Sequence, residues 1–598
     1  MKKTLIASLN ILLFTLSSFA GNSDMKISYE LNFDKPNSHL MVVTMTVSGV
    51  DSKTLDFAIP AWRPGRYAIQ NYSRLIQEFS AVDQNKKSLP FKKSDKDTWK
   101  VETGSAKTVS VTYKFYATIL DAGSTYYDED EIYFNGANLF MYLPDSKELP
   151  VTLKINSPEK WTIATGLKKE SERNYSAPNY DDFIDCPTII SPSIKHEVVT
   201  VNNIQINIWV QGETNGDLKT LADDISKIAK VQFEFWNYVP FKEYHFLYHF
   251  FDKPFSHGVE HKNSTSICVG PLKKMSNPKD FSRIQGVTSH EMFHAWNIKT
   301  LFPDNLGLTF DYTKENYTDL LYVAEGFTSY FGDYMLIKAG LLTEEKYFNT
   351  QAKDMKVFED TPGNSLQTLA ESSQESWLTG YGYDGSKNKL VNFYSKGELV
   401  GLLLDLEIRS ATNYEKSLGD VMRLLYQKRA MKKKGYTTED LKDAIKEVSG
   451  NDFSEFFANY VYGLKPLDFK DALDKNGYSF EKLPDVGTIR FSLGLELRRQ
   501  DNLWQVTNVI PGSAAFNAGI DMNDLIIASD GQFLNLISVE KSLPDSDLES
   551  WFQDLGNPKS ITFTIIRKGV VRKITVSGIN YDNYKYSIKK KDDNKRVW

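Results

Sequence analysis

The spacing of apolar residues divides the chain into three stretches of different character. From about Met25 to about Asn202, short segments with strand-like character stand between Gly and Pro residues. Segments bounded in this way by turn-forming residues are typical of β-strands. The first stretch therefore predicts a β-rich domain, and a sandwich is its expected fold. Its clearest strand segments are Leu40–Val47, Val109–Tyr116 and Ile194–Val201.

The second stretch, from about Asn203 to Leu467, changes to helical periodicity. A short strand at residues 204–210 is followed by a helical pattern at residues 217–236. Residues 318–339 place apolar side chains where one largely buried helix needs them. Residues 244–251 (YHFLYHFF) instead alternate and are rich in aromatics, which predicts a strand. The stretch predicts a mostly α-helical domain, whose later amphipathic segments are Lys396–Ser410, Ser417–Ala430 and Thr438–Val448.

The third stretch, from about Asp485 to Ile579, returns to strand-like patterns. Residues 490–497 (RFSLGLEL) are expected to form a strand that contains a glycine. Together with VTNVIPGSAA at residues 506–515, they resemble a bacterial PDZ domain. In this resemblance, Leu493, Gly494 and Leu495 correspond to the loop whose N–H groups capture a peptide carboxylate. The alternative is a PDZ fold that serves only as a structural wing.

Composition limits the class of protein. A chain of 598 residues is too long for one core, so several domains are expected. With 41% hydrophobic and 25% charged residues and a net charge of −6, it resembles an ordinary soluble globular protein. No strong basic block precedes the short tail Lys589–Lys591, which argues against nucleic acid as a partner.

The amino terminus predicts a targeting segment. Lys2 and Lys3 precede the apolar run Leu5–Leu16, and Ser18-Phe19-Ala20 fits a small-x-small cleavage site. We therefore expect residues 1–20 to be a signal peptide that is cleaved after Ala20. No other apolar run is long enough to span a bilayer. The mature protein is expected to be exported, and to be periplasmic or secreted in a bacterium.

His290-Glu291-Met292-Phe293-His294 carries the most specific chemistry in the chain. On a helix, positions i and i+4 share a face, so both imidazoles can reach one ion. Glu291 follows the first histidine, where it can act on the attacking water rather than on the metal. A catalytic zinc needs three protein ligands and one open position. The motif therefore predicts a third ligand further along the chain.

Glu325 is the candidate for that third ligand. It lies in the middle of the apolar helix predicted at residues 318–339, where a carboxylate is costly unless it is paired or bound to a metal. Asp333, on the same helix, is the weaker candidate. We therefore predict one Zn²⁺ per chain, bound by His290, His294 and Glu325, with Glu291 as the general base.

Other histidines and the two cysteines suggest no second metal site. His245 and His249 are four residues apart, but on a strand that spacing is too long for one ion. His261 is expected in a loop or strand edge near the zinc site. Cys186 and Cys268 are far apart in sequence, and either a disulfide or two buried free thiols is expected.

Several segments together resemble the glycyl aminopeptidase family of gluzincins, which are bacterial zinc peptidases that carry a PDZ domain. The resemblance spans nearly the whole mature chain, and the combination is more specific than any one motif. It implies a thermolysin-like catalytic domain between a β-rich domain and a PDZ domain, that is, a multidomain α+β fold. The segments are AWRPGRYAIQNYS (61–73), HGVEHKNST (257–265), HEMFHAWNIK (290–299), YVAEGFTSYFGDYM (322–335) and FYSKGELVGLLLDLEIR (393–409).

The resemblance also implies two further roles. Tyr394 matches the tyrosine that assists the oxyanion in related aminopeptidases. Gly258 and Glu260 match the substrate strand, in which the glutamate holds the free α-amine of a substrate. An aminopeptidase that favours small amino-terminal residues such as glycine is therefore expected.

Three departures and two alternative functions accompany this expectation. His257 stands where the family pattern has a glycine, and the segment 299–303 is less basic than expected. The segment between His294 and Glu325 is long, so it is expected to form part of the cleft. The alternatives are an endopeptidase assisted by its PDZ domain, and a non-catalytic peptide-binding protein with a vestigial zinc site.

Overall fold

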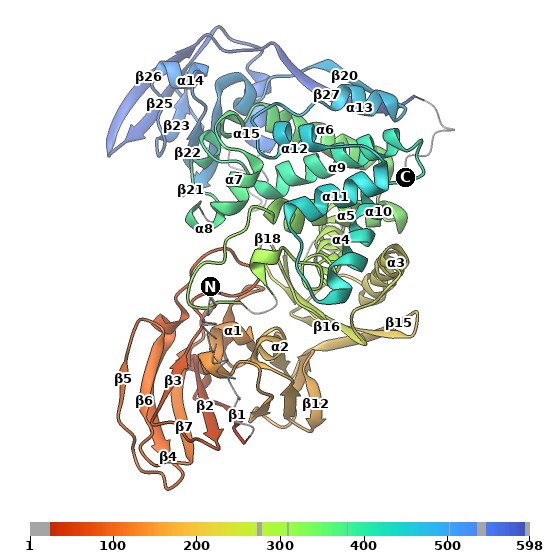
Figure 1. The fold of residues 1–598 in the computed structure, drawn as a ribbon. Coiled ribbons are helices and arrows are strands. Elements are labelled where there is room, and N and C mark those ends of the chain that lie inside the picture. The colour runs from red at the N-terminus through yellow and green to blue at the C-terminus, as the bar shows by residue number, and fades with distance from the viewer. Residues whose placement is uncertain are drawn as a thin grey trace, which may run out of the picture.

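The computed structural model describes residues 24–271, 278–307, 310–379, 381–500, 503–534 and 546–591. The predicted signal peptide, residues 1–20, lies outside these ranges. Figure 1 shows three regions in chain order: a β-rich region at the bottom, a helical region in the middle and a smaller β-containing region at the top. Within the described residues, no helix is both long enough and apolar enough to cross a membrane.

The first region is β-rich, as predicted. Its largest sheet has seven strands, in the order β12-β13-β10-β1-β2-β7-β4. Every second side chain of the central strands is buried, as expected for strands with one face on a core. The seven strands are β1 (Lys26–Phe33), β2 (Leu40–Ser48), β4 (Ile76–Asp83), β7 (Thr108–Tyr116), β10 (Val151–Ile155), β12 (Lys168–Ser171) and β13 (Asn174–Ala177).

Two smaller sheets complete this region. One apolar core joins Val43 and Val111 of the seven-stranded sheet to Phe57 and Val101 of the three-stranded sheet. The three-stranded sheet contains β3 (Thr54–Ala58), β5 (Phe91–Lys93) and β6 (Thr98–Glu102). The four-stranded sheet contains β8 (Thr125–Tyr127), β9 (Ile132–Phe134), β11 (Thr162–Thr165) and β14 (Thr188–Ser191), and the short helices are α1 (Gly136–Leu139) and α2 (Tyr180–Ile184).

A five-stranded sheet opens the middle, helical region. Its order is β15-β16-β17-β19-β18, so β18 is the last strand and pairs only with β19, antiparallel. β15, which the sequence groups with the first stretch, pairs with β16 of this sheet. The strands predicted at 204–210 and 244–251 are confirmed. The five strands are β15 (Lys195–Val201), β16 (Ile204–Gln211), β17 (Glu243–Phe250), β18 (Phe255–Glu260) and β19 (Ser264–Gly270).

Helices follow this sheet along the chain, and the segments predicted to be amphipathic at residues 396–410, 417–430 and 438–448 are helical. The helix predicted at 217–236 is α3 (Leu218–Trp236), and the Asp217 carboxylate caps it by accepting from the amides of Lys219 and Thr220. The other helices are α4 (Pro278–Phe293), α5 (Thr328–Lys338), α6 (Glu344–Glu359), α7 (Leu369–Gln374), α8 (Ser376–Thr379), α9 (Phe393–Ala411), α10 (Leu418–Lys428), α11 (Thr438–Ser449), α12 (Ser454–Tyr460) and α13 (Phe469–Lys475).

The helix predicted at residues 318–339 is shorter and less regular than expected. Residues 318–320 are not helical, and Tyr322–Phe327 forms a π-helical turn before α5 begins. This turn packs closely against α9, since a Cβ on Gly326 would lie 2.4 Å from the Cα of Gly397. π-Helical turns are rare and often occur at functional sites, and this one carries Glu325.

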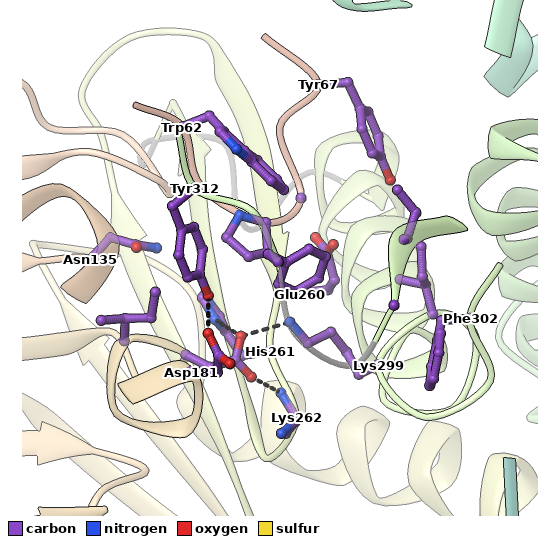
Figure 2. Close-up of a pocket in the computed structure, with 18 of the residues that line it drawn as sticks. Trp62, Tyr67, Asn135, Asp181, Glu260, His261, Lys262, Lys299, Phe302 and Tyr312 are labelled. Carbon is purple, nitrogen blue, oxygen red and sulfur yellow. Dashed lines mark hydrogen bonds and ion pairs between the residues drawn. The ribbon is translucent and has the colours of Figure 1, made fainter. Parts of the chain in front are cut away.

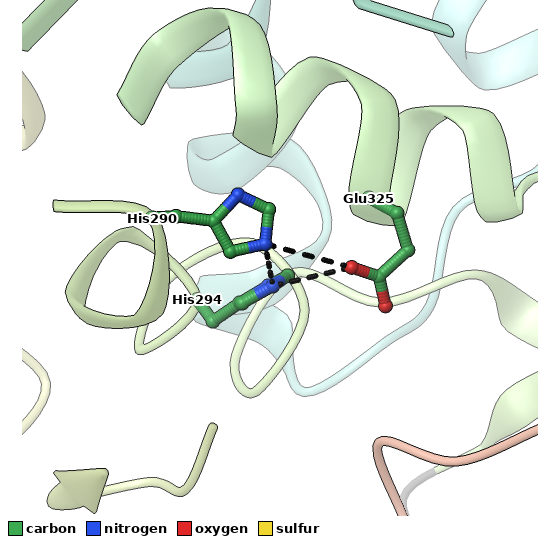
Figure 3. A group of neighbouring side chains, drawn as sticks. All are labelled: His290, His294 and Glu325. Atoms are coloured by element: carbon green, nitrogen blue, oxygen red, sulfur yellow. Dashed lines mark hydrogen bonds and ion pairs between the residues drawn. The ribbon is translucent and has the colours of Figure 1, made fainter. Parts of the chain in front are cut away.

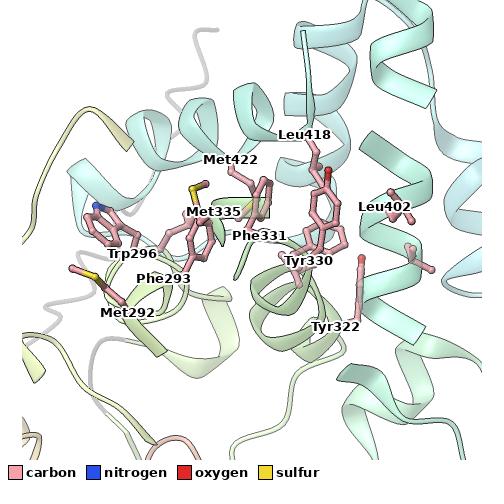
Figure 4. Close-up of a cluster of buried hydrophobic side chains, with 14 of the residues drawn as sticks. Met292, Phe293, Trp296, Tyr322, Tyr330, Phe331, Met335, Leu402, Leu418 and Met422 are labelled. Carbon is pink, nitrogen blue, oxygen red and sulfur yellow. The ribbon is translucent and has the colours of Figure 1, made fainter. Parts of the chain in front are cut away.

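The apolar core behind the metal motif is built from several helices. Phe293 of α4 faces Phe331 and Met335 of α5, Met292 lies beside Trp296 in the same core, and α10 contributes Met422 (Figure 4). All of these side chains are buried, and the rings of Phe293 and Phe331 stack 5.1 Å apart. This packing fixes α4 and α5 relative to each other, so the polar residues on their opposite faces have defined positions.

The carboxy-terminal region contains a sheet of β21 (Leu495–Gln500), β22 (Leu503–Val509), β23 (Leu525–Ser529), β24 (Gln532–Phe533), β25 (Ser560–Arg567) and β26 (Val570–Ser577). β20 (Tyr478–Asp485) and β27 (Asn583–Lys590) form a separate pair, and the helices are α14 (Ala514–Ala518) and α15 (Ser546–Asp554). The prediction of a strand at residues 490–497 is wrong for the first half of that segment. Ile489–Leu493 forms a π-helical turn that the Thr488 side chain caps, and β21 begins only after Gly494, whose φ is 79°.

Candidate metal centre and active site

His290, His294 and Glu325 meet as predicted. Nε2 of His290 and Nε2 of His294 are 3.0 Å apart, and Oε2 of Glu325 lies 3.8 Å and 3.3 Å from them (Figure 3). Donor atoms on a tetrahedral zinc, with bonds of about 2.1 Å, lie roughly 3.4 Å apart. The three donors therefore match the spacing that one Zn²⁺ requires.

Neighbouring groups orient two of the three side chains, His294 and Glu325. Nδ1 of His294 lies 2.7 Å from the carbonyl oxygen of Asn297, so Nδ1 carries the proton and Nε2 is free to bind a metal. The Tyr67 hydroxyl donates a hydrogen bond of 2.9 Å to Oε1 of Glu325 and leaves Oε2 to face the histidines. Tyr67 belongs to the β-rich region, so the metal centre is completed across the domain junction.

Glu291 lies beside this centre without a partner of its own. Its Oε2 is buried and has no hydrogen bond among the described residues. Burial raises the pKa of Glu291 to about 8; His294 opposes this effect, whereas Glu260 and Glu325 add to it. Gly258 makes room for the carboxylate, because a Cβ there would lie 2.1 Å from Oε1 of Glu291. An unpartnered carboxylate in this place is suited to move protons during a reaction.

Glu260 lies at the end of the edge strand β18 and is buried. Its carboxylate oxygen lies within 4.8 Å of donor atoms of Glu291 and His294. Glu260, Glu291 and His294 are thus a second group that could hold a metal. We favour the first group because it uses both histidines of the motif and a carboxylate that Tyr67 orients. Gly65, with φ +77°, permits the close approach of Glu260, because a Cβ there would lie 2.6 Å from Oε2.

Tyr394 lies in the first turn of α9, where Asn392 caps the helix. Burial raises its pKa well above the usual value, and the charges of Glu325 and Glu260 act in the same direction. The phenol therefore stays protonated near the proposed metal centre. The structure brings Glu260 and Glu291 together with the candidate ligand residues, and Tyr394 is near enough for the charges of Glu325 and Glu260 to act on it.

A cavity of about 80 Å³ adjoins Glu260 at the domain junction (Figure 2). Trp62 and Gly65 line it from the β-rich region, and the segment between His294 and Glu325 contributes Lys299, Phe302 and Tyr312. The long segment therefore lines the cavity beside Glu260, and its part in the substrate cleft stays a prediction.

Charged side chains at the base of this cavity are paired. Nζ of Lys299 lies 2.6 Å from Oδ1 of Asp185, and the ring of His261 lies 3.2 Å from the same oxygen. The Tyr312 hydroxyl donates to Asp181 over 2.5 Å. Burial alone would raise the pKa of Asp185, but Lys299 and His261 hold it below its ordinary value. These pairs tie the β-rich region to the segment that follows the metal helix.

The other histidines and the two cysteines singled out in the sequence lie among packing contacts, outside the metal cluster. The ring nitrogen of His245 accepts from the Trp209 indole over 3.2 Å, and His249 packs edge-on against Tyr133. Cys186 and Cys268 are both free and buried, as one of the two expectations held. Sequence reasoning missed Tyr67 and Gly65, although both lie in the noted segment 61–73. The signal there was a polar Arg-Pro-Gly-Arg-Tyr run inside a β-rich stretch.

The predicted carboxylate loop of the carboxy-terminal region is largely occupied by its own contacts. Leu493 and Leu495 are buried. The amide of Gly494 already donates to the carbonyl oxygens of Ile489 and Arg490. The region also docks onto the catalytic region, where Arg498 pairs with Asp384 at 2.9 Å.

Two parts of the chain match known families. Residues 28–192 match the Peptidase M61 N-terminal domain, and residues 283–400 match M61 glycyl aminopeptidase. The second match contains the three ligand residues, Glu291 and Tyr394. No curated protein matches the chain significantly. The chain is thus similar to M61 peptidases over both regions that build the site, and these matches support a metallopeptidase.

Solved structures extend the comparison. An aminopeptidase N family protein from Idiomarina loihiensis is 26% identical, with a TM-score of 0.86, and the match covers 95% of this chain and 99% of that chain. A mutant of an M1 zinc metallopeptidase from Deinococcus radiodurans, bound to a Tyr-Ser-Ala substrate, is 11% identical with a TM-score of 0.44. That match covers 72% of this chain and 92% of the other. The first comparison shows that the multidomain fold occurs in another protein along almost its entire length.

Proposed function

We propose that this chain is a zinc-dependent aminopeptidase of the M61 glycyl aminopeptidase family. The observation that carries the proposal is the cluster of His290, His294 and Glu325 with two further buried carboxylates, Glu291 and Glu260. The first three residues would hold the ion. When bound, zinc lowers the pKa of water and polarises the carbonyl that is attacked.

Glu291 is the proton carrier in this proposal. It accepts a proton from the attacking water and passes it to the leaving amine. Its buried, unpartnered oxygen is available for both steps.

Tyr394 donates a hydrogen bond to the oxygen of the carbonyl under attack. As negative charge develops there, a preorganised phenol stabilises it without the reorganisation that water would need. The position of Tyr394 close to Glu325 and Glu260 supports this role.

Glu260 binds the free α-ammonium of the substrate. A buried carboxylate beside the metal cluster supplies the complementary charge, and the edge strand β18 offers backbone groups to an extended peptide. The adjoining cavity of about 80 Å³ is smaller than the roughly 150 Å³ that holds a benzene ring. Its size supports a preference for small amino-terminal residues such as glycine.

The test compares free and amino-acetylated peptides with the parent and two variants. Glu291→Gln is expected to retain zinc and lose nearly all turnover. Glu260→Ala is expected to lower kcat/KM on free-amine peptides by about ten- to more than a hundredfold, the range of a charged hydrogen bond, with little change on acetylated peptides. Equal cleavage of both kinds by the parent would replace this proposal with the endopeptidase. Zinc binding without any hydrolysis would favour the peptide-binding protein.

Two further parts of the proposal concern the ends of the chain. The sequence of residues 1–20 supports export to a bacterial periplasm or medium, and amino-terminal sequencing of the mature protein should begin at Gly21. For the carboxy-terminal sheet we propose a PDZ-like structural wing, because its loop Leu493–Leu495 is buried and internally bonded. Peptide arrays that show carboxy-terminal capture would instead assign it a peptide ligand.

A further inference from the structure

A second cavity, of about 400 Å³, lies behind helix α9. Residues of α6, of the segment 464–469 and of the β20–β27 pair line it. Met355, Phe358, Leu467 and Phe480 form apolar parts of its wall. The proposed peptidase activity makes no use of this cavity.

Lys396 lines this cavity and has no acidic partner. The residue is only 2% exposed. None of the described carboxylates lies within 4 Å of its ammonium, which lies over the Phe358 ring, 5.6 Å from the ring centre. Burial lowers the pKa of Lys396 to about 8, so the amine is still mainly charged at pH 7. A buried charge without a partner is costly, which is the usual sign of a missing ligand or of a functional amine.

The two carboxylates that also line the cavity are engaged elsewhere. Glu359 accepts hydrogen bonds from the hydroxyls of Tyr584 and Tyr586. Asp468 caps α13 by accepting from the amide of Lys470 over 3.2 Å. Neither acid therefore pairs with Lys396, and the lysine within 4 Å of Glu359 is Lys482, at 3.5 Å.

We propose that this cavity binds a small monocarboxylate with an apolar body, and that Lys396 pairs with the carboxylate. A charge-assisted hydrogen bond would satisfy the ammonium, and the apolar wall would cover the body of the ligand. A medium-chain fatty acid and the carboxyl end of a short hydrophobic peptide share this chemistry. Lys396 follows Tyr394 by two residues, so the two side chains lie on different sides of α9 and the cavity is separate from the metal centre.

The test measures binding of octanoate and N-acetylphenylalanine to the full chain by calorimetry. Octanol and octylammonium are the controls for the apolar body and for the charge. Lys396→Met should weaken binding of the carboxylate at least tenfold. Lys465→Met, which removes a lysine at the same cavity that is exposed, should leave the affinity within about twofold. Lys396→Arg should retain binding because it keeps the charge.

The outcomes distinguish a fatty acid from a peptide end as the ligand, and they show whether the proposal fails. Stronger binding of octanoate indicates a fatty acid, and stronger binding of N-acetylphenylalanine indicates a peptide end. Equal affinity of the parent and Lys396→Met, equal binding of octanol, or no binding of either carboxylate at millimolar concentration would overturn the proposal. If Lys396→Met does not fold, Leu467→Trp, which fills the cavity, must abolish binding. None of these measurements depends on zinc or on hydrolysis, so the proposed function can fail independently.

Discussion

Lys299 and Lys396 line two different cavities, and the two lysines differ in whether a carboxylate pairs with them. The Lys299 side chain, in the cavity at the domain junction, is 8% exposed and pairs with Asp185 at 2.6 Å. Lys396, in the cavity behind α9, is 2% exposed and pairs with none of the described carboxylates. The first lysine holds two regions of the chain together. The second lysine has no such partner, so its charge is available to the carboxylate ligand proposed above. Burial alone therefore does not show whether a lysine is structural; the partners do.

The largest expected difference is in kcat, between variants on the two sides of α9. Tyr394→Phe should lower kcat by roughly 10²–10³, because the variant loses a preorganised donor to the developing oxyanion. Lys396→Met, on the other side of the same helix, should change kcat far less. Steady-state kinetics on a free-amine peptide measure both variants under one condition. Near-normal kcat in Tyr394→Phe would reduce that residue to a packing role and remove the contrast.

Replacing Lys299 should lower the free energy of unfolding, whereas replacing Lys396 should not. Lys299→Met leaves Asp185 buried without its main partner, and losses of this kind are roughly 3–5 kcal/mol. The expected loss is at the lower end, about 3 kcal/mol, since His261 and the Lys262 amide still contact Asp185. Lys396→Met removes an unpaired buried charge and should be neutral or stabilising. Denaturant unfolding of both variants without ligand measures the two changes. A loss in Lys396→Met equal to that in Lys299→Met would show that Lys396 has a structural partner.

Sequence patterns predicted the parts of the site that a local motif or a family resemblance specifies. His290, Glu291 and His294 follow from a five-residue motif, and Glu325 follows from a carboxylate in an apolar segment. The family resemblance added Tyr394 and Glu260. The fold could be predicted where the local pattern is strong. Residues 217–236, for example, have a clear helical periodicity, and the helix lies nearly where expected.

Contacts between distant segments could not be predicted in this way. The hydrogen bond from Tyr67 to Glu325 joins residues 258 positions apart, and no local pattern specifies it. The π-helical turn at Tyr322–Phe327 depends on the close contact between Gly326 and Gly397, which belongs to tertiary packing. The segment 490–497 has the composition of a strand, but the cap from Thr488 and the positive φ of Gly494 turn its first half into a π-helical turn.

The cross-domain contact at Tyr67 predicts the smallest effect, and it tests whether the domain-junction cavity is part of the metal centre. Tyr67→Phe removes the donor to Oε1 of Glu325 and keeps the ring. Groups that orient a ligand in this way typically contribute 10- to 100-fold to metal affinity, so the zinc dissociation constant should rise by about tenfold. Competition with a chelator measures it without any assay of activity. Tyr29→Phe is the matched control, since that buried hydroxyl donates to the Met141 carbonyl, far along the chain from the metal residues. If Tyr67→Phe binds zinc as tightly as this control, the β-rich region contributes walls to the cleft but does not orient the ion's ligand.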